Sequence, residues 1–122
     1  MKATIVAAAL AVVCFSSIAR ADGDAALGKS VFNKCAICHT IDPAKKGIGP
    51  TLFGVVGRHS ASVAGFSYSE AMKAANKTWD AATLDVYLTD PKALVPGTKM
   101  VFPGLPKPED RANVIAYLST LK

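Results

Sequence analysis

Cysteine is scarce in this chain: only Cys14, Cys35 and Cys38 occur among its 122 residues. Cys35 and Cys38 are separated by two residues, so a disulfide between them would close a very short loop and stabilise almost nothing. The scarcity therefore excludes a fold held together by several disulfides, as in many small secreted domains.

Sustained alternation of apolar and polar residues, internal repeats and low-complexity linkers are also absent. Without alternation there is no strand signal, so we expect an all-α fold in a single domain. Basic residues exceed acidic ones only modestly, 14 against 9, for a net charge of +5. This excess suits acidic protein partners, but it is too small and too scattered to indicate nucleic-acid binding.

The first 21 residues have the three regions of a secretory signal peptide. Lys2 is followed by an uncharged run of 17 residues, 3–19, and the segment ends in the small-residue pattern Ala19-Arg20-Ala21. Cleavage after Ala21 leaves residues 22–122 as one periplasmic domain whose net charge is +3, because Lys2 and Arg20 are lost from the total of +5. The alternative is an uncleaved membrane anchor, but the run is shorter than the ~20 residues that span a bilayer. We therefore expect no stable membrane insertion after cleavage.

The stretch Cys35-Ala36-Ile37-Cys38-His39 has the attachment pattern of a c-type haem. Its two thiols can add to the vinyl groups of a porphyrin, and the imidazole of His39 can then reach the iron. A redox dithiol or half of a zinc site also uses two cysteines at this spacing, but neither explains the histidine. A zinc site needs four ligands, and only His59 remains to help complete the set. We expect one covalent haem c, bound through Cys35, Cys38 and His39.

The first expected helix runs from Ala25 to about Cys35. Its apolar residues recur at helical spacing, and Gly28 stands where another backbone could approach. Leu27, Val31 and Phe32 form its apolar face. From residue 42 to residue 62, six prolines and glycines interrupt the chain, which predicts a loop.

Two shorter helices are expected in the middle of the chain. Ser67 and Glu70 have the spacing of a capping box, which predicts a helix to about Ala75 that Asn76 ends. Asp80 is a good N-cap for a helix that runs to Thr89. The Asp90-Pro91 step stops that helix, since a residue before proline disfavours the helical region, and a loop follows over residues 91–106.

The last expected helix begins at Pro108. Proline suits the first helical position, and the acidic Glu109 and Asp110 suit the positive end of the helix dipole. Its apolar residues at helical spacing predict a buried stripe of Val114, Ile115, Leu118 and Leu121.

Several further blocks of residues follow one another in a characteristic order. They are Phe32-Asn33-Lys34-Cys35, Gly49-Pro50-Thr51-Leu52, Gly57-Arg58, Gly65-Phe66-Ser67-Tyr68, Trp79, Pro96-Gly97-Thr98-Lys99-Met100, Phe102 and Ile115-Ala116-Tyr117-Leu118. Together with the haem motif, they resemble class I cytochrome c over nearly all of residues 24–122, closest to the small bacterial kind related to cytochrome c2 and to mitochondrial cytochrome c. The resemblance implies the cytochrome c fold: about four to five short helices and long loops around one haem, with the N- and C-terminal helices packed together.

The resemblance also implies roles at the haem that spacing alone leaves open. By residue type, Met72, Met100 and His59 could each be the sixth ligand of the iron, and the resemblance points to Met100. It implies that the Pro50 carbonyl accepts a hydrogen bond from the imidazole of His39. It further implies that Arg58, Tyr68 and Trp79 donate to the haem propionates. Tyr87 and Thr98 would form hydrogen bonds near the methionine sulfur. Leu52, Leu84 and Phe102 would form apolar walls. Met72 departs from mitochondrial relatives, which carry asparagine there.

With both axial positions filled by protein, the resemblance implies a one-electron carrier and not an enzyme. Electrons would pass at the haem edge, where we expect a basic rim of Lys34, Lys45, Lys46, Lys92 and Lys99. The expected partners of this monomer are acidic-faced redox proteins, such as a quinol-cytochrome c oxidoreductase, a terminal oxidase, a photosynthetic reaction centre or a dehydrogenase. The alternative from another class is haem-based catalysis or gas sensing, with Met100 absent from the iron or labile.

Overall fold

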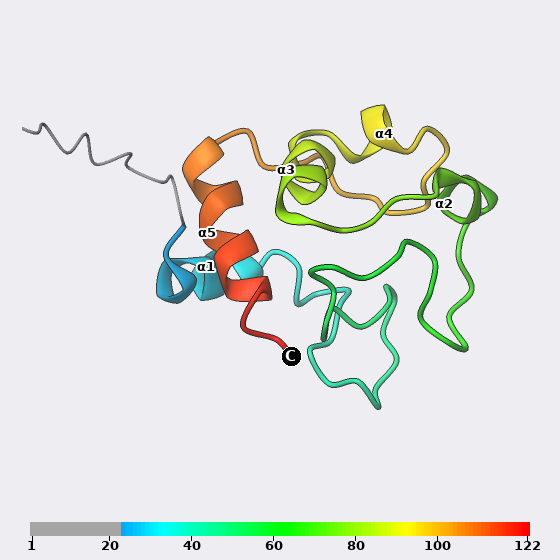
Figure 1. Cartoon of the computed structure of the whole chain (residues 1–122), viewed down its shortest axis with the longest axis horizontal. Helices are drawn as coiled ribbons and strands as arrows, with labels where there is room; N and C mark the ends of the chain where they lie inside the picture. The colour runs from blue at the N-terminus through cyan, green and yellow to red at the C-terminus, as the bar shows by residue number, and fades with distance from the viewer. Residues whose placement is uncertain (1–22) are drawn as a thin grey trace, which may run out of the picture.

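The computed structural model describes residues 23–122, which form five helices and no strand. The helices are α1 (Ala25–Phe32), α2 (Glu70–Ala75), α3 (Ala81–Thr89), α4 (Pro91–Leu94) and α5 (Pro108–Leu118) (Figure 1). The expectation of an all-α fold is therefore confirmed. The predicted signal peptide, residues 1–21, lies outside the described residues, and within residues 23–122 no helix has the length and apolarity to cross a membrane.

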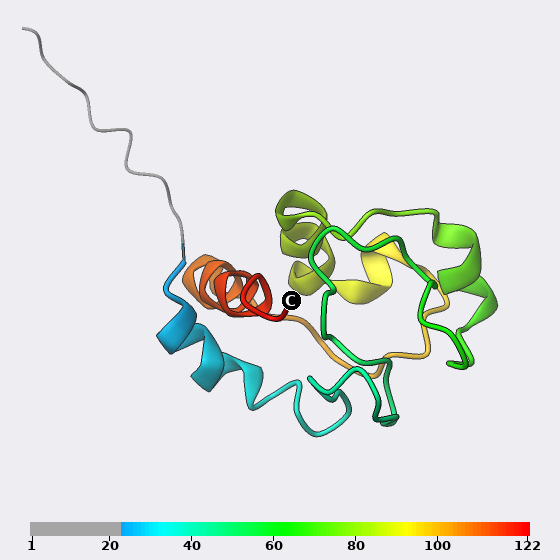
Figure 2. The same ribbon diagram turned by 60° about the horizontal axis from the view of Figure 1, so that its bottom comes forward.

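The first and last helices, α1 and α5, pack directly against each other (Figures 1 and 2). Their backbones come closest at Gly28, where a Cβ atom would lie only 1.9 Å from the carbonyl oxygen of Asn113. The ring of Phe32 packs on the ring of Tyr117 with a centroid separation of 5.2 Å. The expected approach of another backbone at Gly28 and the expected pairing of the terminal helices are both confirmed.

Helix α1 is shorter than expected, since it ends at Phe32 and not at about Cys35. Beyond Phe32 the backbone hydrogen bonds tighten to three-residue spacing, as from the Cys35 N–H to the Phe32 carbonyl, and the chain continues in turns. Leu27 was expected on the buried face, but it is exposed, because Gly28 and Phe32 form the face that meets α5.

The N-cap of α2 is Ser69 and not Ser67. The buried Ser69 hydroxyl accepts a hydrogen bond from the N–H of Met72 at 3.0 Å, whereas Ser67 is exposed. Ser69 wins because it stands directly before the first helical residue, where its oxygen can reach the free N–H groups of the first turn. Asn76 ends the helix as expected, in the left-handed conformation with φ of 49°.

Helices α3 and α5 begin at the expected residues, with Asp80 as the N-cap of α3 and Pro108 as the first residue of α5. The segment after α3 was expected to be loop throughout, but Pro91–Leu94 forms α4. Asp90 ends α3 and at once caps α4, and proline is well suited to a first helical position. Helix α5 ends at Leu118, so Leu121 lies beyond it, where it still packs against the core.

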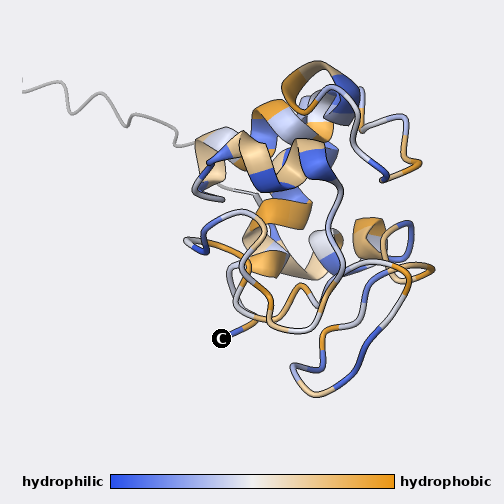
Figure 3. Ribbon diagram, turned by 90° about the vertical axis from the view of Figure 1, so that its right-hand side faces the viewer, coloured by the Kyte–Doolittle hydropathy of each residue, from blue (hydrophilic) through white to orange (hydrophobic). Residues whose placement is uncertain are grey.

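Loop residues form much of the interior. Val55, Val95 and Leu105 belong to no helix, yet they are as deeply buried as the apolar residues of α3 and α5. Apolar residues accordingly occur along the loops as well as along the helices (Figure 3). Because the loops and α2, α3 and α4 curve around a central region (Figure 2), these side chains can surround a bound group.

Candidate cofactor site

A largely apolar cavity of about 520 Å³ lies in this central region. Its size is typical of small-molecule and cofactor sites. It is lined by every residue that the sequence assigned to the site: Cys35, Cys38, His39, Pro50, Leu52, Arg58, Tyr68, Trp79, Tyr87, Thr98, Met100 and Phe102. Residues from separate stretches of the chain therefore meet around one space, although the role of each stays a prediction.

His39 is held in one orientation at the wall of the cavity. Its Nδ1 lies 2.7 Å from the carbonyl oxygen of Pro50, and since a carbonyl can only accept, Nδ1 carries the proton and Nε2 keeps its lone pair. Burial lowers the pKa of His39, and the positive charge of Arg58 acts in the same direction, against the opposing effect of the Pro50 hydrogen bond. The neutral imidazole, the form that binds a metal, is thus favoured.

Gly49 belongs to the block Gly49-Pro50-Thr51-Leu52, but sequence reasoning assigned it no role of its own at the site. A Cβ atom there would lie 2.5 Å from Cε1 of His39 and 2.7 Å from its Nδ1. Only glycine leaves room for the imidazole beside the loop. The signal was its place directly before Pro50, but a glycine in a glycine-rich loop does not reveal which side chain lies against it.

Cys35 and Cys38 are free thiols at the same cavity. The N–H groups of Cys38 and His39 both donate to the carbonyl of Cys35, at 3.0 and 2.9 Å, which closes the motif into a turn. Burial, and then the neighbouring Cys38, raise the pKa of the Cys35 thiol. The turn brings both sulfur atoms and the imidazole to one cavity, as a group attached through two thioethers requires.

Met100 lines the cavity from the segment after α4. Its sulfur accepts a hydrogen bond from the Tyr87 hydroxyl at 3.8 Å, and its N–H donates to the Thr98 hydroxyl at 3.3 Å. Burial raises the pKa of Tyr87, although a hydrogen bond with Thr98 opposes the shift, so the hydroxyl keeps its proton. The methionine is therefore positioned by its neighbours on both the side chain and the backbone.

The two other possible ligands, His59 and Met72, also line this cavity. Both ring nitrogens of His59 have protein partners, Nδ1 with the Ser60 carbonyl at 2.8 Å and Nε2 with Oδ1 of Asn76 at 2.9 Å. Met72 lines the cavity from α2 and packs against the core. It is Met100, and not Met72, that accepts the hydrogen bond from Tyr87.

The predicted propionate donors also line the cavity. Arg58 uses Nη1 to bind the Phe53 carbonyl at 3.1 Å, which leaves most of its five N–H groups for another acceptor. Burial lowers the pKa of Arg58, because desolvation disfavours the charged form of the guanidinium. The hydroxyl oxygen of Tyr68 accepts from the Val63 N–H at 3.0 Å, so its own proton is available to donate. Their binding to propionates stays a prediction.

Three exposed apolar residues at the cavity were missed from the sequence. Ile37, Ile48 and Val101 are 78%, 79% and 95% exposed, respectively, and all three line the cavity. Lone apolar residues on loops carry no periodic signal, so only the fold shows that they border the same cavity. We call these three residues the apolar mouth.

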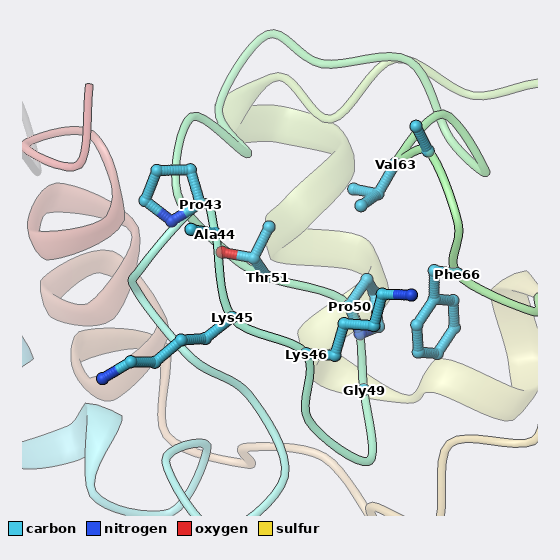
Figure 4. A pocket seen from close by; sticks show the side chains of 10 residues that line it. Pro43, Ala44, Lys45, Lys46, Gly49, Pro50, Thr51, Val63 and Phe66 are labelled. Atoms are coloured by element: carbon cyan, nitrogen blue, oxygen red, sulfur yellow. The ribbon is translucent and has the colours of Figure 1, made fainter.

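The predicted basic rim is only partly assembled at the cavity. Lys34 and Lys99 line it, whereas Lys45, Lys46 and Lys92 do not. Lys45 and Lys46 lie instead at a small hollow of about 70 Å³, where they extend in different directions (Figure 4). The ammonium of Lys46 reaches the region of Gly65, and that of Lys45 lies 3.8 Å from the Asp42 carboxylate.

The residues around the large cavity fit a c-type haem. Two thiols, a neutral imidazole with a free Nε2 and a soft thioether face a space with mostly apolar walls. This donor set matches the chemistry of covalent attachment and axial ligation of haem iron. Within residues 23–122, no group of three or more His, Cys, Asp or Glu residues is arranged to hold a metal ion.

Comparisons with known proteins agree with this fit. A family model described as Cytochrome c matches residues 25–122. Cytochrome c2 of Rhodomicrobium vannielii is 54% identical over 121 residues, which cover 98% of this chain and 97% of the relative. Cytochrome c-550 of Nitrobacter winogradskyi is 51% identical over 98 residues, or 80% of this chain and 90% of the relative. The solved structure of cytochrome cH from Methylobacterium extorquens covers 80% of this chain and 99% of its own, with a TM-score of 0.76 and 48% identity.

Proposed function

Because this chain belongs to the cytochrome c family and carries one covalently bound haem c, we propose that His39 and Met100 hold the iron as its two axial ligands. The chain is an electron-transfer protein and not an enzyme. The observation that carries the proposal is the shared cavity, which His39 enters with a free Nε2 and Met100 enters with its sulfur oriented by Tyr87. When bound, the haem supplies an iron that can cycle between Fe(III) and Fe(II) by one electron.

The protein residues around the cavity hold the two proposed ligands in place and shield the site from water. The Pro50 carbonyl fixes the ring orientation of His39 and makes the imidazole a better electron donor. Apolar walls exclude water from the site, and the Tyr87 hydroxyl withdraws some electron density from the Met100 sulfur. A site with both axial positions filled has no place for a substrate, which suits a carrier.

The partner surface lies at the apolar mouth. Ile37, Ile48 and Val101 give a small surface that a partner can dehydrate, and Lys34 and Lys99 add positive charge at the same opening. Such a surface suits brief, salt-sensitive docking to acidic-faced redox proteins of respiratory or photosynthetic chains, such as a quinol-cytochrome c oxidoreductase, a terminal oxidase, a photosynthetic reaction centre or a dehydrogenase. Stopped-flow rates with one such protein should fall as salt is raised, and rates that stay flat would contradict this docking mode.

The chain acts in the periplasm after export. Residues 1–21 have the composition of a signal peptide, and haem attachment to free thiols suits an exported chain without other cysteines. The mature protein should begin at Asp22 and behave as a monomer. Intact-mass measurement of the exported protein tests the cleavage site, and a retained N-terminal segment in the membrane fraction would contradict it.

Visible spectra of the exported protein test the axial ligands. We expect c-type bands in both redox states and, in the oxidised state, the weak near-red band of a sulfur-to-iron bond. The substitution Met100→His should abolish the near-red band, whereas the matched control Met72→Leu should keep it. A spectrum that Met100→His leaves unchanged would overturn the assignment. A protein that binds carbon monoxide or nitric oxide readily, without any near-red band, would support gas sensing instead.

A further inference from the structure

An ion pair between Arg111 and Asp85 joins α5 to α3 beside the chain that follows Met100. The side chain of Arg111 is only 11% exposed, and its Nε donates to a carboxylate oxygen of Asp85 at 2.8 Å. Its Nη1 donates to the carbonyl of Leu105 at 2.8 Å and to that of Pro106 at 3.2 Å. One guanidinium therefore connects two helices with the chain that follows Met100.

The methionine segment, residues 100–106, is attached to α3 at both ends. At its start, the Met100 sulfur accepts from the Tyr87 hydroxyl, and near its end, the Leu105 N–H donates to the Leu88 carbonyl at 2.6 Å. Between these attachments Val101 is almost fully exposed. Phe102 packs against the core between these attachments, and the backbone at Gly104 lies against the carbonyls of Leu88 and Thr89. The hydrogen bonds that hold the segment to α3 are at its two ends.

We propose that Arg111 and Asp85 clamp the methionine segment shut and so act as positioning residues for the sulfur of Met100. The inference rests on the proposed ligation by His39 and Met100. Hydrogen bonds from a charged guanidinium are stronger than neutral ones. The guanidinium is largely out of contact with water, whereas the side chain of Asp85 is 49% exposed. A lysine cannot replace Arg111 here, because its ammonium has no planar array of donors to serve a carboxylate and two carbonyls at once.

Ligand exchange in the oxidised holoprotein tests the clamp. Imidazole in excess replaces the methionine only after the segment opens, so the limiting exchange rate, followed by loss of the near-red band, reports opening. We expect the rate to rise about tenfold in Arg111→Lys and in Asp85→Asn. Hydrogen exchange of the Leu105 amide should quicken by a similar factor, while the amide of the buried Val114 should not respond in this way.

A matched control separates the clamp from general loss of stability. Asn113 lies on the same helix, but its side chain accepts from the Asp24 N–H at 2.8 Å, beside α1 and away from the methionine segment. The urea concentration is adjusted so that the wild type and Asn113→Ala have the same free energy of unfolding. Under these conditions Asn113→Ala should exchange its ligand at the wild-type rate. Rates within twofold of wild type in both Arg111→Lys and Asp85→Asn, or an equal acceleration in Asn113→Ala, would overturn the clamp.

The outcomes also distinguish the clamp from the ligation on which it rests. If the wild-type protein shows no near-red band, the ligation by Met100 is wrong, and Arg111 and Asp85 cannot position its sulfur at the iron. If the band is present and the exchange rates do not change, the ligation stands and the clamp is wrong. The Leu105 amide decides whether Arg111 closes the segment, independently of any ligand at the iron.

Discussion

The contact between α1 and α5 at Gly28 allows a quantitative prediction. In Gly28→Ala, the new Cβ atom would lie 1.9 Å from the Asn113 carbonyl oxygen and 2.9 Å from Cβ of Tyr117. Because the nearest atom is backbone and cannot rotate away, the helices must separate by about 1.5 Å to restore normal contact. Overpacking of this kind costs up to about 3 kcal/mol, and alanine returns about 1 kcal/mol of helix propensity, so we expect a net loss of about 2 kcal/mol.

Urea unfolding of the holoprotein, followed by circular dichroism, measures this loss. With a slope of about 2 kcal/mol per molar, the midpoint should fall by about 1 M without a change in slope. The control is Ser30→Ala on the same helix, where the side chain is exposed and the substitution should leave the midpoint unchanged or raise it slightly. A midpoint for Gly28→Ala at or above the wild-type value would refute the close backbone contact.

Three further substitutions test the site and a helix cap. Gly49→Ala places a Cβ atom 2.5 Å from the imidazole of His39, so the covalently attached haem should show a high-spin spectrum, and an unchanged low-spin spectrum would count against the crowding. Tyr87→Phe removes the hydrogen bond to the Met100 sulfur, so the sulfur should donate more electron density to Fe(III). The midpoint potential in a redox titration should fall by about 20–60 mV, and a raised potential would contradict this. A hydrogen bond from a backbone N–H lowers the pKa of Asp80 below its ordinary 3.8. The stability that the charged Asp80 cap contributes is therefore complete above pH 3.8 and is lost as pH falls through the lowered pKa. The difference in unfolding free energy between wild type and Asp80→Ala should accordingly narrow at acidic pH. A difference that stays constant with pH would show that the charge of Asp80 is not the cause.

Local signals in the sequence predicted the helix starts well. Asp80 and Pro108 mark the beginnings of α3 and α5 because capping and proline geometry involve only residues within one turn. The same local reasoning failed where two candidates compete, as Ser67 and Ser69 do before α2. Ser69 caps the helix because it stands directly before the first helical residue, and the spacing of Ser67 and Glu70 alone did not show where the helix would begin.

The sequence by itself determined the haem chemistry, because thioether attachment and the proximal ligand come from five consecutive residues, 35–39, and need no distant partner. The tertiary structure alone decided which distant groups meet around them. Ile37, Ile48 and Val101 share one cavity mouth, and Arg111 reaches Asp85 across 26 positions of the chain. Such contacts leave no trace in spacing or composition, since they depend on how helices and loops that are distant in the sequence pack around a common centre.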